Sequence, residues 1–168
     1  MLNLTRREWL VAAACWTEVL HGQDFRAQDF RFLDASTAGE IEALAETILP
    51  GARDAGLIRF IDGALAGYDQ DRRADYQKGM AEVQTRRIAL FPDSKTIASL
   101  NEQERIRLAT DIEKSDFFAL VRRHTVLGFF GHPRHGGNRN GASAKLLGIQ
   151  EAMMYSPPFG YYDREAAK

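Results

Sequence analysis

The sequence predicts an all-α fold: a small irregular helical domain of about five main helices, a glycine-rich loop and an extended aromatic tail at the C-terminus. Three observations lead to this prediction. Apolar residues recur at three- and four-residue spacing, residues that start and stop helices flank these segments, and no segment alternates apolar and polar residues as a half-buried strand does. A length of 168 residues with 45% hydrophobic residues suits one globular domain with a hydrophobic core.

The first two predicted helices each have a recognisable end. Thr37 and Glu40 form the Thr-x-x-Glu pattern of a capping box, in which the hydroxyl and the carboxylate satisfy free amides at a helix start. Apolar residues at helical spacing follow, and Pro50-Gly51 stops this helix. The second helix is expected over residues 55–66, with Gly67 at its end.

Two further helices are expected over residues 71–90 and 102–114. The first of them is the more polar, and Phe91-Pro92 ends it. Asn101 caps the second, which is predicted to bury Ile106, Ala109 and Ile112 on one stripe.

The fifth predicted helix, residues 116–130, differs from the others. Its apolar residues, among them Phe117, Phe118, Phe129 and Phe130, cover most of its circumference. Such a helix is buried by its own domain or by a partner protein. The glycine-rich loop 131–141 and a brief helical segment at 142–147 follow it.

The tail, residues 155–163, combines prolines with aromatic residues. Pro158 restricts the backbone of a segment that carries Phe159, Tyr161 and Tyr162. Aromatic anchors that have little conformational entropy to lose are efficient at interfaces, which favours a docking arm. The alternative is that the tail folds back over the core of its own domain.

The charged residues almost balance. The chain has 22 Lys and Arg residues against 23 Asp and Glu residues, a net charge of -1. There is therefore no global field to draw the protein onto nucleic acid or an anionic membrane. Partners must be inferred from local features.

The N-terminal segment resembles a twin-arginine export signal. Arg6 and Arg7 precede Trp9, Leu10 and a short apolar stretch, which is the order of a positive region and an apolar region in a signal peptide. The alternative is an amphipathic N-terminal helix that packs on the domain. Cys15 and the alanines before it leave open whether the segment is cleaved, lipidated or retained. The predicted organisation is a signal-like segment, a linker or arm, and a helical domain, at residues 1–23, 24–32 and 33–168.

The loop 131–141 is the densest polar cluster, so we tested it as an active site. It has neither the Gly-x-x-x-x-Gly-Lys-Ser/Thr pattern of a phosphate-binding loop nor the Gly-x-Gly-x-x-Gly pattern of a dinucleotide fold. An enzyme would use His124, His132 and His135, but no Cys or carboxylate lies close in sequence to His132 and His135 to complete a metal site. In the structural alternative, Asn138 and Arg139 tie the loop to an adjacent surface.

Several short motifs together resemble the gluconate 2-dehydrogenase subunit 3 family. One run contains Phe117-Phe118-(x)3-Arg122, Gly128-Phe129-Phe130 and Pro133-(x)2-Gly136-Gly137-Asn138-Arg139, followed by Lys145-Leu146-Leu147-Gly148, and these short motifs are specific in combination. Upstream, the segments 43–50 and 51–62 are similar to the first helices of that family. The resemblance spans about residues 32–162.

The resemblance implies a non-catalytic small subunit with no cofactor or metal of its own. Such subunits accompany a large FAD-dependent dehydrogenase of the glucose-methanol-choline type, which acts on a sugar, glucoside or alcohol, and often a cytochrome c subunit that carries haem c. The twin-arginine translocase would export both proteins to the periplasm, where the complex or an uncleaved signal can hold them at the inner membrane. The residues expected to contact the partner are Phe117, Phe118, Arg122, Phe129, Phe130, His135, Gly136, Gly137, Asn138, Arg139, Pro158, Phe159, Tyr161 and Tyr162.

The chain departs from the family pattern at two positions. His135 stands where the family usually has Tyr, and Ala144 stands where it usually has Trp. Losing two large aromatic residues near the loop indicates a changed partner surface, so a gluconate substrate is not carried over. The competing interpretation is a free-standing periplasmic export chaperone.

Overall fold

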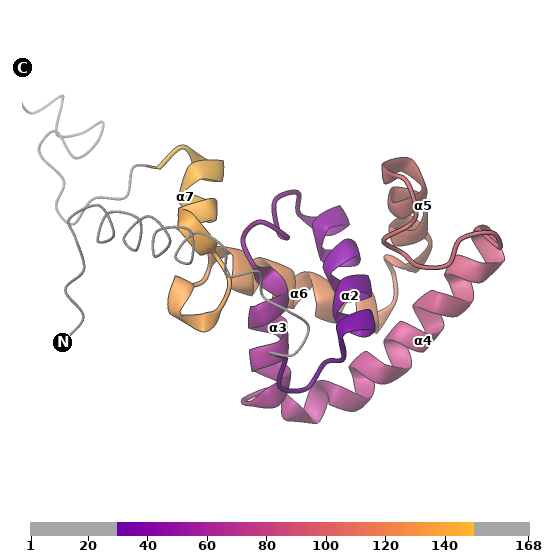
Figure 1. Ribbon diagram of the computed structural model, residues 1–168, viewed down its shortest axis with the longest axis horizontal. Coiled ribbons are helices and arrows are strands. Elements are labelled where there is room, and N and C mark those ends of the chain that lie inside the picture. The colour runs from indigo at the N-terminus through magenta and orange to yellow at the C-terminus, as the bar shows by residue number, and fades with distance from the viewer. Residues whose placement is uncertain (1–29, 150–168) are drawn as a thin grey trace, which may run out of the picture. The chain divides into compact units, whose positions relative to one another are not determined.

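The computed structural model describes residues 30–149, and within this range the chain is all-α (Figure 1). The predicted fold class is therefore confirmed. The structure divides into two units, Met1–Phe30 and Arg31–Lys168, and every described helix belongs to the second. The α-helices are α2 (Ala35–Ile48), α3 (Leu57–Ala66), α4 (Arg73–Leu90), α5 (Glu102–Ile112), α6 (Asp116–Phe130) and α7 (Ala142–Leu147). The 3-10 turns are η2 (Gln70–Arg72), η3 (Pro133–His135) and η4 (Arg139–Gly141).

Helix α2 begins at a different cap from the predicted one. The carboxylate of Asp34 accepts hydrogen bonds from the amide and the hydroxyl of Thr37, at 2.9 and 2.7 Å. These bonds hold the pKa of Asp34 below its usual value. The predicted capping box was wrong, because Glu40 is buried and its carboxylate accepts the amide of Ile97 at 2.7 Å. That bond closes the loop before α5 onto α2.

The buried carboxylate of Asp62, in α3, fixes the segment that leads into α2. It accepts the backbone amides of Arg31, Phe32 and Leu33 at 2.8 to 2.9 Å. The guanidinium of Arg73 lies over the Phe32 ring, 4.8 Å from its centroid. These residues are therefore tied to α3 although they precede the first described helix.

Helix α4, with 18 residues, leads through a loop to α5, which packs against both α4 and α2 (Figure 1). Phe91 ends α4, and Asn101 with Glu104 forms a complete capping box at the start of α5. The predicted stripe of α5 was partly wrong, because Ile106 is 50% exposed while Leu108 is buried in its place beside Ala109 and Ile112. The amphipathic face of this helix is thus rotated relative to the predicted one.

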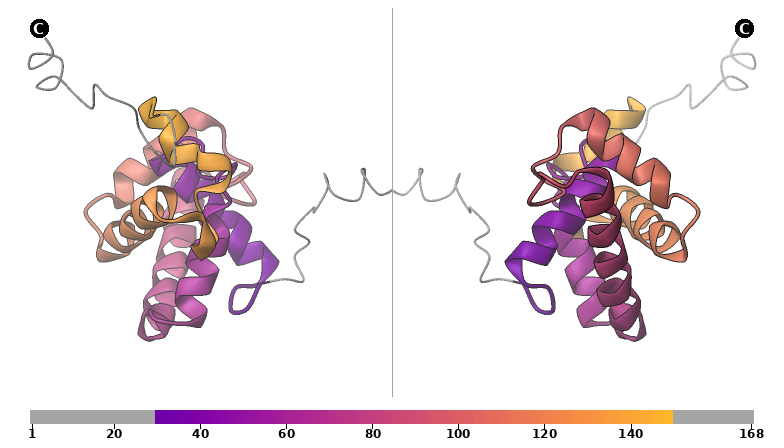
Figure 2. Two further views of the ribbon diagram at one scale, coloured as in Figure 1. Left: turned by 90° about the vertical axis from the view of Figure 1, so that its left-hand side faces the viewer. Right: turned by 90° about the vertical axis from the view of Figure 1, so that its right-hand side faces the viewer.

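The core lies where α6 crosses α2 and α3. Helix α6 runs behind both in Figure 1 and contacts each of them, and α4 contacts α5 and α6 (Figures 1 and 2). The largest fully buried side chains come from all of these helices and the loop before α5: Ile41, Leu44, Leu57, Ile61, Leu65, Tyr76, Val83, Ile97, Leu108, Val121, His124 and Phe129. None of the helices within residues 30–149 has the length and apolar character that a membrane span requires.

Candidate functional site

Helix α6 carries most of the predicted site residues, and its bounds were predicted correctly. Ser115 caps it by accepting a hydrogen bond from the amide of Phe118 at 3.1 Å. The negative charge of Asp116 in the first turn interacts favourably with the positive end of the helix dipole. One side of the helix, including Phe117, Val121 and Phe129, is buried against the rest of the domain. The other side remains exposed, so this apolar helix is only half covered by its own domain.

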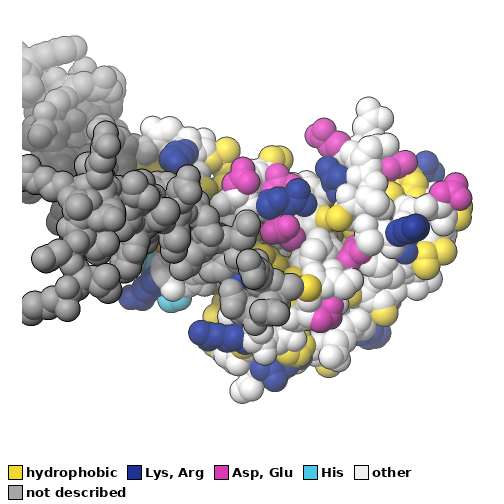
Figure 3. Space-filling view, in the orientation of Figure 1, with side chains coloured by type: hydrophobic (Ala, Val, Ile, Leu, Met, Phe, Trp, Pro, Cys, Tyr) yellow, Lys and Arg dark blue, Asp and Glu magenta, His cyan; other side chains and the backbone are white. Residues whose placement is uncertain are grey.

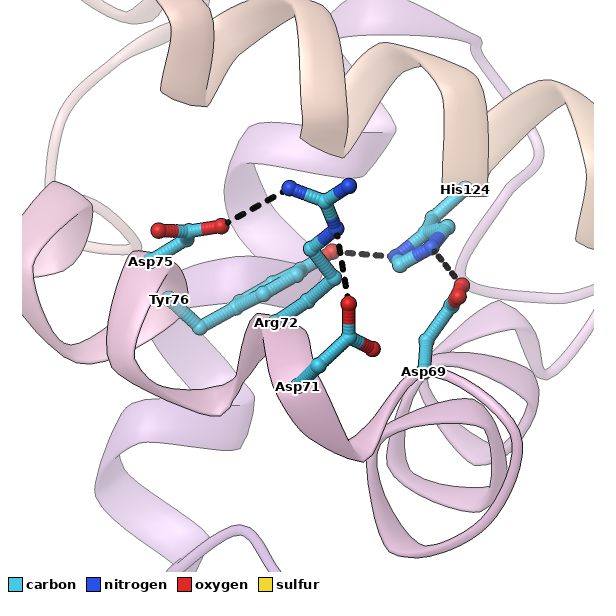
Figure 4. Close-up of polar contacts among 6 residues, drawn as sticks. All are labelled: Asp69, Asp71, Arg72, Asp75, Tyr76 and His124. Carbon is cyan, nitrogen blue, oxygen red and sulfur yellow. Dashed lines mark hydrogen bonds and ion pairs between the residues drawn. The ribbon is translucent and has the colours of Figure 1, made fainter.

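A chain of three polar side chains crosses the buried side of α6 (Figure 4). The Tyr76 hydroxyl of α4 lies 2.8 Å from Nδ1 of His124, and Nε2 of His124 lies 2.8 Å from Asp69. Because a carboxylate only accepts hydrogen bonds, Nε2 donates to Asp69, and Nδ1 of the neutral ring accepts from Tyr76. The network ties α4 and α6 to the loop after α3.

Burial determines what this network can do chemically. His124 has no exposed surface, and Tyr76 is 2% exposed, so a substrate could not reach either ring without opening the core. Burial lowers the pKa of His124, with Asp69 opposing the shift, and burial raises the pKa of Tyr76. Both groups are therefore neutral at pH 7, and the network is a structural element. The sequence could not reveal it, because Asp69 and His124 lie 55 residues apart.

The free energy of unfolding is expected to fall as the pH drops below about 6.5, the usual pKa of histidine. In this range the unfolded chain takes up a proton at residue 124 that the folded chain resists, so acid favours unfolding until the pH reaches the lowered pKa of the folded state. The slope should be at most about 1.4 kcal/mol per pH unit. The lowered pKa of Asp34 also makes the free energy of unfolding fall with acid, but only near and below about pH 3.8. Urea unfolding at several pH values measures the slope.

The matched control for that experiment is another histidine. H124Q should lower the free energy of unfolding at pH 7 and flatten its dependence on pH, whereas H132Q, at an exposed position, should leave the slope unchanged. A slope that survives in H124Q would show that another group is responsible.

An open groove of about 420 Å³ lies beside the network, between α4 and the start of α6. Arg72 lies 3.6 Å from Asp71 and 3.3 Å from Asp75 at this surface (Figure 4). Lys78 and Glu82 also line the groove. Charges of both signs alternate there, and exposed ion pairs of this kind contribute little to the stability of the fold. The lining of the groove therefore has no predominant sign of charge that would select an anionic or a cationic ligand.

The glycine-rich loop packs its backbone directly against α3 and α6. A Cβ at Gly137 would overlap the carbonyl oxygen of Gly128, and Gly136 has a φ of +100° with the backbone of Arg59 behind it. A Cβ at Gly56 would overlap the guanidinium of Arg139. At Gly137 the backbone of α6 is too close for a side chain, whereas at Gly56, with a φ of +69°, and at Gly136 the left-handed backbone conformation favours glycine.

Asn138 holds the two ends of this loop together. It is 5% exposed and has a φ of +53°, which Asn tolerates better than most residues. Its amide donates to the carbonyl of Gly131 at 2.9 Å, and its side-chain oxygen accepts the amide of Ser143 at 2.9 Å. The backbone amide of Arg139 donates to Ala55 at 3.0 Å. Asn138 and Arg139 thus connect α6, α7 and the start of α3.

The three histidines of the predicted enzymatic site do not come together. His124 lies in the buried network, whereas His132 and His135 are exposed and interact with Arg134. Across residues 30–149, no three His, Cys, Asp or Glu side chains are grouped so that they could hold a metal ion.

The other predicted contact residues differ in their accessibility. Phe117 and Phe129 are buried, Phe118 is half-buried, and Arg122 and Phe130 are exposed. Phe117 meets the Tyr76 ring edge-on at 5.4 Å, and a Cβ at Gly79 would overlap it. The remaining predictions, namely Arg6, Arg7, Trp9 and Leu10 in the export motif and Pro158, Phe159, Tyr161 and Tyr162 in the tail, lie outside the described residues.

One group of exposed apolar residues was not recognised from the sequence. Leu146 and Leu147 of α7, with Ile149 after it, are each more than half exposed, and so they join the exposed side of α6 as uncovered apolar surface. A sequence signal does accompany them. No Asp or Glu occurs between Asp116 and Glu151, whereas the rest of the chain is rich in both.

The described residues form a small helical domain with a buried polar network and with exposed apolar residues on α6, on α7 and at Ile149. The family model described as gluconate 2-dehydrogenase subunit 3 matches residues 35–145, more than half of the chain. The chain belongs to this family, which confirms the resemblance seen in the sequence. Membership is consistent with an accessory subunit of a multi-subunit dehydrogenase complex. The search of curated proteins and the search of solved structures each returned no significant match.

Proposed function

We propose that the chain is the non-catalytic small subunit that binds and stabilises an FAD-dependent dehydrogenase of the glucose-methanol-choline type. The family match over residues 35–145 carries this proposal. The polar chemistry of the described residues is consistent with it, because His124 and Tyr76 are inaccessible and bonded within the domain. The FAD, and haem c where a cytochrome subunit is present, would belong to the partner proteins. The partner's substrate would be a sugar, a glucoside or another alcohol.

The same proposal includes the route of export. Arg6 and Arg7 would direct the chain to the twin-arginine translocase, and the folded flavoprotein would cross with it to the periplasm. A flavoprotein binds its cofactor as it folds, so a route that transports folded proteins suits such a partner. If this chain carries the export signal for both proteins, that role explains why an accessory chain has an export-like motif.

Copurification tests the subunit role and separates it from that of a free-standing chaperone. The full chain, tagged at its C-terminus and expressed in its native host, should bring a large protein from the periplasm in a fixed ratio. That protein should show flavin absorbance and oxidise a sugar or alcohol with a dye acceptor. A chain that comes out of the periplasm alone would support the chaperone, and dye reduction by the isolated chain would support an enzyme.

A further inference from the structure

The uncovered apolar side chains gather at one end of the described domain. Among residues 30–149, six of the nine exposed large hydrophobic residues lie between residues 126 and 149, and each keeps 44 to 58% of its surface exposed. We call this group the α6–α7 surface: Val126, Leu127, Phe130, Leu146, Leu147 and Ile149. Singly exposed apolar residues are ordinary, whereas a contiguous exposed apolar patch marks an interaction site.

The two halves of the α6–α7 surface belong to neighbouring elements. Val126, Leu127 and Phe130 follow the i, i+1, i+4 spacing of one helix side, opposite the buried Gly128 and Phe129. Helix α7 contacts α6 and lies near its carboxyl end (Figures 1 and 2). The two groups of exposed apolar side chains therefore come from neighbouring elements.

Contacts behind this surface hold it in place. The Phe130 ring packs edge-to-face on the buried Phe129, with 5.3 Å between ring centroids. Asn138 connects the end of α6 to the start of α7 through its bonds with Gly131 and Ser143. A surface that is ordered before binding loses less conformational entropy in a complex, which favours affinity.

The charged residues of the segment that carries this surface have one sign. The segment 117–150 contains Arg122, Arg123, Arg134, Arg139 and Lys145 and no acidic residue. Acidic and basic side chains are interspersed over α2, α4 and α5 on the face shown in Figure 3. The segment that carries the α6–α7 surface thus combines exposed apolar residues with these basic residues, which we call its cationic surround, in a chain whose net charge is -1.

We propose that the α6–α7 surface docks onto an apolar patch, edged by acidic residues, on the flavoprotein subunit. The inference rests on the proposed function and specifies which face of the chain performs it. Opposite charges around an apolar centre increase the association rate and fix the orientation of the partner. A membrane is the less suitable occupant, because α7 has six residues and the apolar residues are divided between two short segments rather than lying along one long amphipathic helix.

The test compares matched substitutions in the full chain, using the flavoprotein recovered in the copurification above. L127D and L146D should each weaken binding of that flavoprotein at least about 30-fold, since truncating an anchor of this kind costs about 2 kcal/mol or more. I88D and I106D, at positions of α4 and α5 that are 54% and 50% exposed, should leave affinity unchanged. Far-UV circular dichroism and urea midpoints show that each variant is folded.

The cationic surround has its own pair of variants. R122E should slow association of the flavoprotein several-fold, and the difference from the wild type should shrink as salt is added. K78E, at a position of α4 whose side chain is 82% exposed, should have no such effect. Equal losses in R122E and K78E would overturn the charge complementarity.

Three results would overturn the proposed surface and leave the subunit role intact. The first is wild-type affinity of L127D and L146D for the flavoprotein. The second is binding of the wild-type chain to vesicles that contain phosphatidylglycerol, lost in both variants while the flavoprotein still binds. The third concerns hydrogen exchange in the free chain: residues 126–130 and 144–149 would be protected, and deleting residues 150–168 would remove this protection. The tail of the same chain would then be the occupant of the surface. Failure of the wild-type chain to bind any flavoprotein would instead refute the proposed function.

Discussion

Replacing Arg6 and Arg7 together by lysine is expected to remove almost all of the partner's dehydrogenase activity from the periplasm. Lysine keeps the positive charge but lacks the planar fork of the guanidinium, and an export signal is an address that a receptor recognises rather than a simple charge. Because the partner is proposed to cross only together with this chain, both proteins should accumulate in the cytoplasm. Dye-linked activity and immunoblots of the two fractions measure the effect.

Two other arginines supply the control for this experiment. Replacing Arg72 and Arg86, whose side chains are 48% and 65% exposed, by lysine makes the same chemical change outside the N-terminal segment and outside the α6–α7 surface, and should leave export intact. Full periplasmic activity in the Arg6, Arg7 double variant would refute the carrier role. That result would not bear on the subunit role, which the copurification experiment tests separately.

The substitution G137A is expected to lower the free energy of unfolding by about 3 kcal/mol or more. The new Cβ would overlap the carbonyl oxygen of Gly128, which is backbone of a packed helix and cannot rotate away. The loop would have to move off α6, and the hydrogen bonds of Asn138 to Gly131 and Ser143 would be strained with it. A domain of this size has about 5 to 15 kcal/mol of stability in total, so urea unfolding should show a large shift.

Gly39 provides the comparison for G137A. It lies within α2, and a Cβ there would meet nothing within 4 Å. G39A should therefore raise the free energy of unfolding by up to about 1 kcal/mol, since alanine favours a helix over glycine. If G137A were as stable as G39A, the close packing of the loop on α6 would be wrong.

The sequence was most informative where local chemistry determines the structure. Ser115 and Asn101 accept hydrogen bonds from amides within their own helices, so the starts of α6 and α5 could be predicted to the residue. The end of α4 at Phe91-Pro92 depends on the proline that follows it. These features involve residues two to four positions apart, and no knowledge of the tertiary fold is needed.

Local patterns failed where a distant residue decides the outcome. Thr37 and Glu40 have the spacing of a capping box, but Glu40 instead bonds to Ile97, 57 residues away. Ile106 has the spacing of a buried stripe, yet the direction from which α4 and α2 cover α5 exposes it. His124 could be identified as unusual within an apolar helix, but its partners Tyr76 and Asp69 depend on how three segments pack.

The candidate site could be predicted in part for the same reason. The sequence suggested that Asn138 and Arg139 tie the loop to an adjacent surface, and the structure supplies the groups to which they bond and the carbonyl of Gly128 that Gly137 approaches. The apolar circumference of α6 indicated burial, but which half stays uncovered depends on its contacts with α2 and α3. The absence of acidic residues between Asp116 and Glu151 was visible in the sequence, and it acquired a meaning only beside the exposed residues of α6 and α7.

The carboxylate of Asp62 sets the point at which the folded unit can be separated from whatever precedes it. A chain shortened to begin at residue 30 retains the three amide donors of Arg31, Phe32 and Leu33. One that begins at residue 35 leaves a 3% exposed carboxylate without them, and such a loss costs about 1 to 3 kcal/mol. Leader peptides, tags and fusion partners that end before residue 30 should therefore leave these three bonds intact. The export signal proposed for the N-terminal segment could then be exchanged without changing the described domain.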